Sequence, residues 1–216
     1  MTLATLQALD GLRDLSLLKW YVIPLLAIVF YIYAKEISKA RLTKNWDPIY
    51  AGLAVFGLDF FNETWNGWVL WISGRSACWT TPGDTGLRVT VGWNIEIIFM
   101  FLLLGIVFYY SLSEKQDRKI LGIDEKWAVA IGYTIFCVFI ECVLNKADLL
   151  IWEYTLWNRT FAGIWLILIV GYFLFFAGAI FVITRKSKKD KLITLGIIYG
   201  VPVLMNIIAS LGGARY

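Results

Sequence analysis

Three polar residues lie at helical spacing within an apolar segment, and their side chains suit proton chemistry. Asp59, Glu63 and Asn66 fall in residues 49–72, a run long enough to cross a bilayer. At about 100° per residue they occupy a wedge of about 60° on one helix face. Carboxyl groups left unpaired in lipid cost several kcal/mol, so we expect this stripe to face the protein interior or a wet cavity.

A second stripe repeats this spacing later in the chain. Glu141, Asn145 and Asp148 stand at the end of another apolar run, residues 127–144. Because both stripes carry acids and amides at the same helical offsets, we expect the fold to bring them together around one site.

Two kinds of chemistry suit carboxyl groups among aromatic side chains. Burial near other acids favours a neutral carboxylic acid, which can donate a proton to an alkene or epoxide. Aromatic faces would then stabilise the resulting cation. The alternative is cation transport, in which acids relay protons or ions. For catalysis we predict Glu63 as the general acid, with Asp59 and Glu141 tuning or relaying its proton.

The predicted binding residues are the amides, acids and tryptophans expected near this cluster. They are Asn66, Trp65, Trp68, Trp93, Glu96, Asn145, Asp148, Trp152 and Glu153. The loop 73–88 is rich in turn residues and is either a lid, contributing Arg75 and Trp79, or an ordinary connection. The chain lacks a paired Asp-rich diphosphate motif, and the sequence predicts no metal and no cofactor.

Composition indicates an integral membrane protein. Apolar residues make up 59% of the 216 residues, above the 45–50% that is ordinary for soluble domains. The absence of histidine excludes His-dependent metalloenzymes, and the spacing of Cys78, Cys137 and Cys142 makes no metal motif. The net charge of +4 does not indicate nucleic acid, and residues 1–18 lack the features of a cleavable signal peptide.

The continuous apolar runs predict an all-α, polytopic membrane helix bundle that forms a single domain, residues 1–216. Residues 1–18 carry leucines at near-helical spacing and predict an amphipathic surface helix. Six transmembrane helices are expected, at about 20–34, 49–72, 89–112, 127–144, 160–183 and 192–211. The glycine pairs Gly52 and Gly57, and Gly196 and Gly200, are expected at close helix contacts.

Lysine and arginine in the loops predict the orientation. The loops 35–48, 112–126 and 184–191 hold 13 of these residues, and the opposite side holds 7. The positive-inside rule therefore places both termini outside the cytoplasm. With that orientation, every acid within the spans lies at or beyond the membrane midplane, on the side of the termini.

Part of the chain resembles the small integral-membrane terpene cyclases of meroterpenoid pathways. The resemblance lies in residues 44–48 (Lys-Asn-Trp-Asp-Pro) leading into residues 60–65 (Phe-Phe-Asn-Glu-Thr-Trp). It implies an isoprenoid substrate, proton-initiated cyclisation and Glu63 as the proton donor. Residues 63–68 (Glu-Thr-Trp-Asn-Gly-Trp) are also similar to the emopamil-type sterol isomerases, which use membrane-embedded acids and tryptophans.

Three function classes stay open from the sequence. The first is a membrane enzyme that performs carboxyl acid–base chemistry on a hydrophobic or lipid substrate. The second is a small transporter or channel with an acidic vestibule facing outward, although the cytoplasmic half of the spans shows no polar continuation. The third is a structural or assembly subunit without chemistry of its own.

Overall fold

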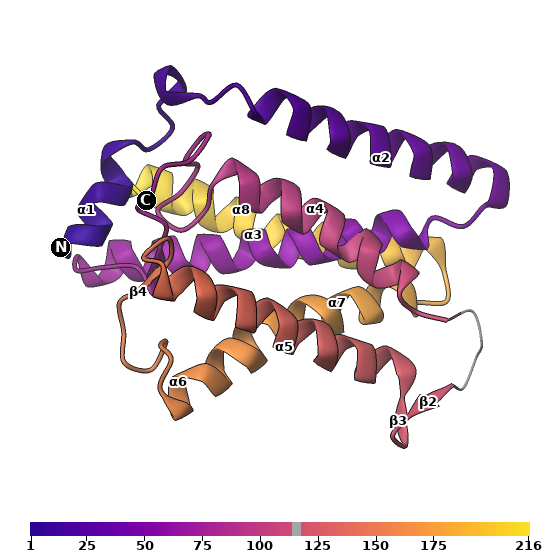
Figure 1. Ribbon diagram of the computed structural model, residues 1–216. Helices are drawn as coiled ribbons and strands as arrows, with labels where there is room; N and C mark the ends of the chain where they lie inside the picture. The colour runs from indigo at the N-terminus through magenta and orange to yellow at the C-terminus, as the bar shows by residue number, and fades with distance from the viewer. Residues whose placement is uncertain (114–117) are drawn as a thin grey trace.

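The protein is a bundle of long helices whose two chain ends lie at the same end of the bundle (Figure 1). A computed structural model describes residues 1–113 and 118–216. Its helices are α1 (Leu3–Asp10), α2 (Val22–Thr43), α3 (Asp47–Ser73), α4 (Ile95–Tyr110), α5 (Glu125–Lys146), α6 (Phe161–Leu166), α7 (Leu174–Ile183) and α8 (Lys188–Leu211), with the short 3₁₀ helix η1 (Leu15–Leu17) and the π-helical segment η2 (Ile167–Phe173). The mostly helical fold confirms the predicted class.

The strands are short and form two small antiparallel pairs. β1 (Trp79–Thr80) pairs with β4 (Ile151–Trp152), placing Trp79 opposite Trp152. β2 (Lys119–Ile120) pairs with β3 (Ile123–Asp124) at the far end of the bundle (Figure 1). We call the end that holds α1, the β1–β4 pair and both chain ends the termini end.

Helix α3 is the central element, packed by α4, α7 and α8. Pro48 stands in its first turn, where a missing N–H costs nothing, and Gly74 ends it with φ +59°. Glycines allow the close approaches: a Cβ on Gly105 of α4 would lie 2.3 Å from the Ala51 carbonyl oxygen, and one on Gly57 would lie 2.6 Å from Ile198 of α8.

The prediction about helix-packing glycines is confirmed for one pair and wrong for the other. Gly52 packs against Tyr33 and the α4 backbone, as Gly57 packs against α8. A Cβ on Gly196 or Gly200 would meet nothing within 4 Å, because this face of α8 points away from the bundle.

The predicted count of six membrane spans is not supported. Among the described residues, three helical stretches are long and apolar enough to cross a membrane: Glu125–Lys146, Phe161–Ile183 and Lys188–Leu211. The last three predicted spans match these stretches. Helix α4 has only 16 residues, α2 carries too many charged residues, and polar residues in the middle of α3 lower its mean hydropathy. The predicted orientation of the termini stays a prediction.

The N-terminal helix is shorter than predicted and packs on protein. α1 covers only Leu3–Asp10, and its Thr5 and Ala8 are fully buried. The following residues turn back along the loop 74–94, where the Arg13 N–H donates to the Arg88 carbonyl at 2.8 Å. Residues 1–18 are thus a cap on the termini end rather than one continuous surface helix.

Candidate functional site

A cavity of about 500 Å³ lies between α3, α4, α5 and η2, toward the termini end. Its polar lining consists of Asp59, Asn62, Glu63, Thr81, Asp84, Asn94, Glu96, Glu141 and Tyr172. Its apolar wall includes Trp79, Phe101, Trp157 and Phe175. Such a volume, with apolar walls and a few convergent polar groups, is typical of small-molecule sites.

The acids of α3 are held in place by donors from the loop 74–94. Asp59 Oδ2 accepts the indole N–H of Trp93 at 2.8 Å. Glu63 accepts the indole N–H of Trp79 on Oε1 at 2.7 Å and the Thr90 hydroxyl on Oε2 at 3.2 Å. Each of the two acids is only 4% exposed, so these neutral donors fix their orientation.

Asn66 continues the same stripe by clamping the loop backbone to α3. Its Oδ1 accepts the backbone N–H groups of Cys78 at 2.7 Å and Trp79 at 3.2 Å. Its Nδ2 donates to the Trp79 carbonyl at 2.8 Å. A Cβ on Gly92 would lie 2.6 Å from this Nδ2, so Gly92 lets the returning loop pass over the clamp. Asn66 therefore positions Trp79, which in turn holds Glu63.

Aromatic stacking fixes the two indoles that reach the acids. Trp93 stacks on Phe56 and Phe60, each with its ring centroid 5.6 Å away. These phenylalanines are four residues apart and flank Trp93 on one face of α3. Trp79 stacks on Trp157 with a centroid distance of 5.2 Å, and Trp65 packs against both. The donors of the site are thus held by packing as well as by hydrogen bonds.

Glu141 reaches the same cavity from α5. It is partly buried, and Cys137 lines the cavity one turn before it on the same helix. The Tyr172 side chain, from η2, lies beside Glu141 and is 7% exposed. The convergence of acids from α3 and α5 that the sequence suggested is present in the structure. The catalytic roles of Glu63, Asp59 and Glu141 stay a prediction.

The π-helical segment is a feature that the sequence reasoning missed. In η2 the backbone departs from α-helical hydrogen bonding inside an apolar stretch, a geometry found frequently at functional sites. Asn62 of α3 donates from Nδ2 to the carbonyl groups of Val170 and Gly171, at 3.4 Å each. The segment carries Tyr172 and thereby sets its position at the cavity. Neither Asn62 nor Tyr172 was a predicted site residue, although each is a polar group in an apolar run.

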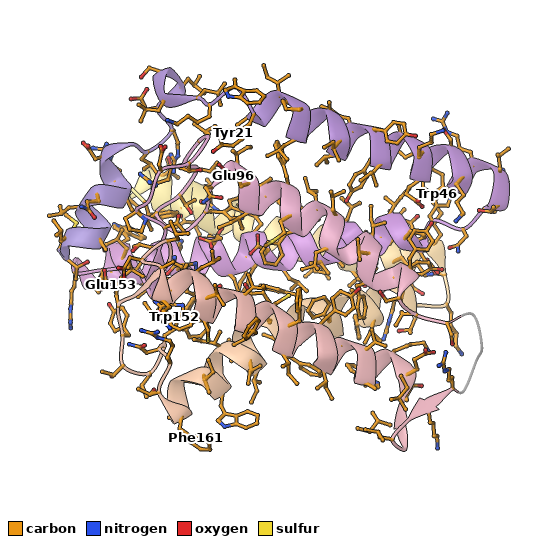
Figure 2. All side chains as sticks on the ribbon, viewed as in Figure 1. Tyr21, Trp46, Glu96, Trp152, Glu153 and Phe161 are labelled. Carbon is orange, nitrogen blue, oxygen red and sulfur yellow. The ribbon has the colours of Figure 1, made fainter. Side chains whose placement is uncertain are left out.

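Glu96 lines the cavity but serves as an anchor. It accepts the Tyr21 hydroxyl at 2.5 Å, the Thr85 hydroxyl at 2.5 Å and the Gly86 N–H at 2.7 Å. Figure 2 shows Tyr21 near Glu96, where the chain enters α2. With these donors in place, Glu96 ties three segments together, and the structure favours a structural role over the predicted contact with a substrate.

Three polar residues predicted to bind substrate do not line the cavity. Asn145 donates to the Leu150 carbonyl at 2.8 Å and so closes the turn after α5. Asp148 is exposed, with a left-handed φ of +57°. Glu153 accepts the Thr2 hydroxyl at 2.7 Å and tethers the N-terminus beside β4 (Figure 2). The helical periodicity behind the second stripe holds only to the end of α5, because the chain turns there.

Of the four tryptophans predicted to bind substrate, two lie next to the site and two lie away from the cavity. Trp65 and Trp93 support the site from behind Trp79 and Asp59. Trp68 packs edge-on against Trp71 near the C-terminal residue, away from the cavity. Trp152 is buried in the β1–β4 pair (Figure 2). Asn66, as shown above, binds the loop backbone rather than facing the cavity.

The loop 74–94 forms one wall of the cavity, and a buried arginine organises it. Arg88 is 7% exposed and donates to the carbonyl groups of Thr81 and Gly83 within the loop, and of Gln7 and Ala8 in α1. Burial lowers the pKa of Arg88 below its usual value. Of the two residues expected from a lid, Trp79 lies at the cavity, while Arg75 stacks over the Tyr154 ring at 5.7 Å, outside it.

Among the residues that the structure describes, no group of three or more cysteines, aspartates or glutamates is arranged to hold a metal ion. The chemistry available at the cavity is that of carboxyl groups with indole, hydroxyl and amide partners. Such a set can donate, accept and relay protons next to an apolar molecule.

Comparison with known proteins defines the class to which this fold and site belong. Residues 2–211 match an uncharacterized membrane protein family, and the chain belongs to that family. It is similar to an uncharacterized protein of Archaeoglobus fulgidus, with 39% identity over 211 residues that cover 97% of each chain. No solved structure matches the chain.

These matches correct the family resemblance drawn from the sequence. The family match spans nearly the whole chain, whereas the terpene-cyclase likeness rested on residues 44–48 and 60–65. Neither the family nor the relative carries a terpene-cyclase or isomerase description, so the resemblance to terpene cyclases was wrong and the similarity to sterol isomerases has no support.

Proposed function

We propose that this protein is a membrane-embedded enzyme that performs acid–base chemistry on a hydrophobic substrate, with Glu63 and Glu141 as its principal proton-exchanging groups. The observation that carries the proposal is one cavity with apolar aromatic walls, into which α3 and α5 bring carboxyl groups. Two different helices supply Glu63 and Glu141, so a molecule in the cavity can meet a carboxyl group from each helix.

The hydrogen bonds around Glu63 suit a group that must hold one orientation through a proton transfer. Trp79 and Thr90 each donate to a different oxygen of this carboxyl group, and both oxygens can still act as proton acceptors or carriers. Donors fixed in advance stabilise charge as it develops without reorganising during the reaction. Asp59, deeper along the same stripe, is held by Trp93 and would exchange protons with Glu63.

Glu141 has a different environment, which suits a partner role. It is partly buried and lies beside the Tyr172 side chain. A proton given to the substrate by one carboxyl group and taken from it by the other leaves the net protonation of the enzyme unchanged. Pairs of titratable groups in different surroundings commonly divide the acid and base roles in this way.

A second candidate function is a cation site open to the termini end. The cavity extends to Asp84, whose side chain is 85% exposed, so five acids line a path from solvent to Asp59. Against transport, the interior of α3, α4 and α7 beyond the cavity is filled by Val55, Phe108 and Phe176, none of which is exposed to solvent. Cation uptake into proteoliposomes tests this alternative directly.

Deuterium exchange tests the enzyme proposal even while the substrate is unidentified. Membranes containing the wild-type protein are incubated in D₂O, and their lipid extract is compared by mass spectrometry with extracts from Glu63→Gln membranes. We expect a lipid that gains deuterium with the wild-type protein and about 10²–10⁴-fold more slowly with the variant, since general acid–base groups contribute about that factor.

The matched control is Asp148→Asn, which removes an exposed carboxyl group outside the cavity and suits the left-handed backbone there. It should exchange at the wild-type rate. Unchanged exchange in a folded Glu63→Gln protein, at wild-type thermal stability, would remove Glu63 from the mechanism.

A further inference from the structure

The cavity reaches the outside of the bundle between α4 and α5. Three of its lining residues are also exposed on the bundle surface: Met100 of α4 is 47% exposed, and Phe136 and Ile140 of α5 are 60% and 38% exposed. Helix α4 packs extensively on α3 but only sparsely on α5. This rim is apolar, and α5 is one of the helices apolar enough to cross a membrane.

Charge in the cavity is of one sign only. Among the described residues that line it, five are acidic and none is a lysine or an arginine. The aspartates and glutamates are Asp59, Glu63, Asp84, Glu96 and Glu141. Of these acids only the exposed Asp84 has a cationic partner, Lys19 at 3.3 Å. An anionic group such as a phosphate deeper in the cavity would meet acids without a compensating cation, which is costly in a buried site.

We propose that the cavity takes an uncharged, lipid-soluble molecule that enters sideways from the bilayer between α4 and α5. The inference rests on the proposed function in treating the cavity as a ligand site, and it adds the substrate class and the route. A charged group, of either sign, would lose its hydration on passing the rim of Met100, Phe136 and Ile140. An uncharged chain passes this rim freely and then contacts the wall of Phe101 and Phe175.

Two cysteines of α5 provide a matched pair of reporters. Cys137 lines the cavity, whereas Cys142, little more than one turn later and partly buried, does not. The test uses two single-cysteine proteins in nanodiscs, one with Cys78→Ala and Cys142→Ala, the other with Cys78→Ala and Cys137→Ala. The measured quantity is the rate of N-ethylmaleimide labelling with hexadecanol, hexadecyl sulfate or hexadecyltrimethylammonium at equal mole fraction in the bilayer.

Hexadecanol at about ten times its half-saturating amount should slow Cys137 labelling about tenfold, by mass action. The two charged compounds should leave the Cys137 rate unchanged, and no compound should affect Cys142. Native mass spectrometry of the protein released from the same nanodiscs gives a second measure of bound alcohol that is independent of thiol reactivity. Equal protection by a charged compound, or equal binding of one, overturns the proposal.

The route is tested by narrowing the rim. Ile140→Trp should slow labelling of Cys137 by membrane-dissolved pyrenyl maleimide several-fold. Ile135→Trp, on an exposed position of the same helix that does not line the cavity, should not. Equal rates in the two variants refute lateral entrance. The two proposals can fail separately. If hexadecanol alone protected Cys137 but Glu63→Gln exchanged deuterium at the wild-type rate, the proposed catalysis would be refuted, and the proposal of an uncharged ligand would still hold.

Discussion

The clamp formed by Asn66 gives the sharpest prediction about how the site is held together. Replacing Asn66 with alanine removes three hydrogen bonds, to the Cys78 N–H, the Trp79 N–H and the Trp79 carbonyl. Asn66 is fully buried, so water cannot replace these bonds without opening the loop. Each buried backbone group left without a partner costs about 1–3 kcal/mol.

The three losses are coupled, because all fall on two adjacent residues that can move together. We therefore expect a loss of about 3–5 kcal/mol in the free energy of unfolding. For a chain of this size, 1 kcal/mol corresponds to about 2–4 °C, so the unfolding midpoint should fall by about 6–20 °C. The measurement is thermal unfolding of the purified protein in a mild detergent, followed by circular dichroism.

A local readout separates release of the loop from general damage. Burial raises the pKa of the Cys78 thiol to about 11, so at pH 8 very little of it is the reactive thiolate. Release of the loop would return the thiol toward its ordinary pKa of about 8.5 and speed maleimide labelling by up to about 200-fold. This is measured in a protein whose other two cysteines are alanine.

The matched control for the clamp is Asn145→Ala, which removes one side-chain hydrogen bond at the end of α5 and leaves the loop 74–94 untouched. It should lower stability by about 1 kcal/mol and leave Cys78 labelling slow. If Asn66→Ala shifted the midpoint by no more than Asn145→Ala and left Cys78 equally slow, the assignment of Asn66 as the clamp would be refuted.

Three further predictions concern the cavity tyrosine, the loop cysteine and a buried glycine. Tyr172→Phe should fold normally and lower the rate of deuterium exchange while shifting its pH profile, because only the hydroxyl beside Glu141 is lost; an unchanged profile would exclude a role in positioning the proton. Labelling of Cys78 in the wild-type protein should rise about tenfold per pH unit between pH 8 and 10, since its thiolate forms only near pH 11, and a plateau below pH 9 would contradict its burial. Gly67→Ala should destabilise the fold by about 1–3 kcal/mol in denaturant titration, because a Cβ there would lie 2.2 Å from the Tyr216 ring; truncation of that ring to alanine in the same protein should relieve the strain.

The stripe on α3 shows how far periodicity in the sequence leads. Asp59, Glu63 and Asn66 had to share one helix face, since a helix repeats every 3.6 residues. The cost of exposing acids to lipid then required that face to be covered. The same reasoning placed Glu141 toward Glu63, and both line the cavity. Composition likewise determined that the chain is a membrane protein, which the family match supports.

Helical periodicity did not predict side-chain positions correctly where a helix ends or where its backbone departs from α-helical hydrogen bonding. Asn145 and Asp148 continue the spacing of Glu141, but α5 ends at Lys146; the Asn145 side chain bonds the turn instead, and Asp148 is exposed. The prediction of six spans was not supported because it counted each long, mostly apolar segment in the first half of the chain as a span. There, the charged residues of α2, the polar residues in the middle of α3 and the short length of α4 set those helices apart from the later three.

Only the tertiary structure decided what each acid touches. Asp59 and Glu63 owe their indole donors to Trp93 and Trp79, which are 34 and 16 residues away along the chain, beyond the end of α3. The π-helical turn that presents Tyr172 depends on backbone hydrogen bonding that side-chain patterns do not record. A sequence specifies local periodicity directly because neighbouring residues share one backbone geometry. It specifies partners across the fold only through the packing of the whole chain, and that packing selected which of the predicted polar residues reached the cavity.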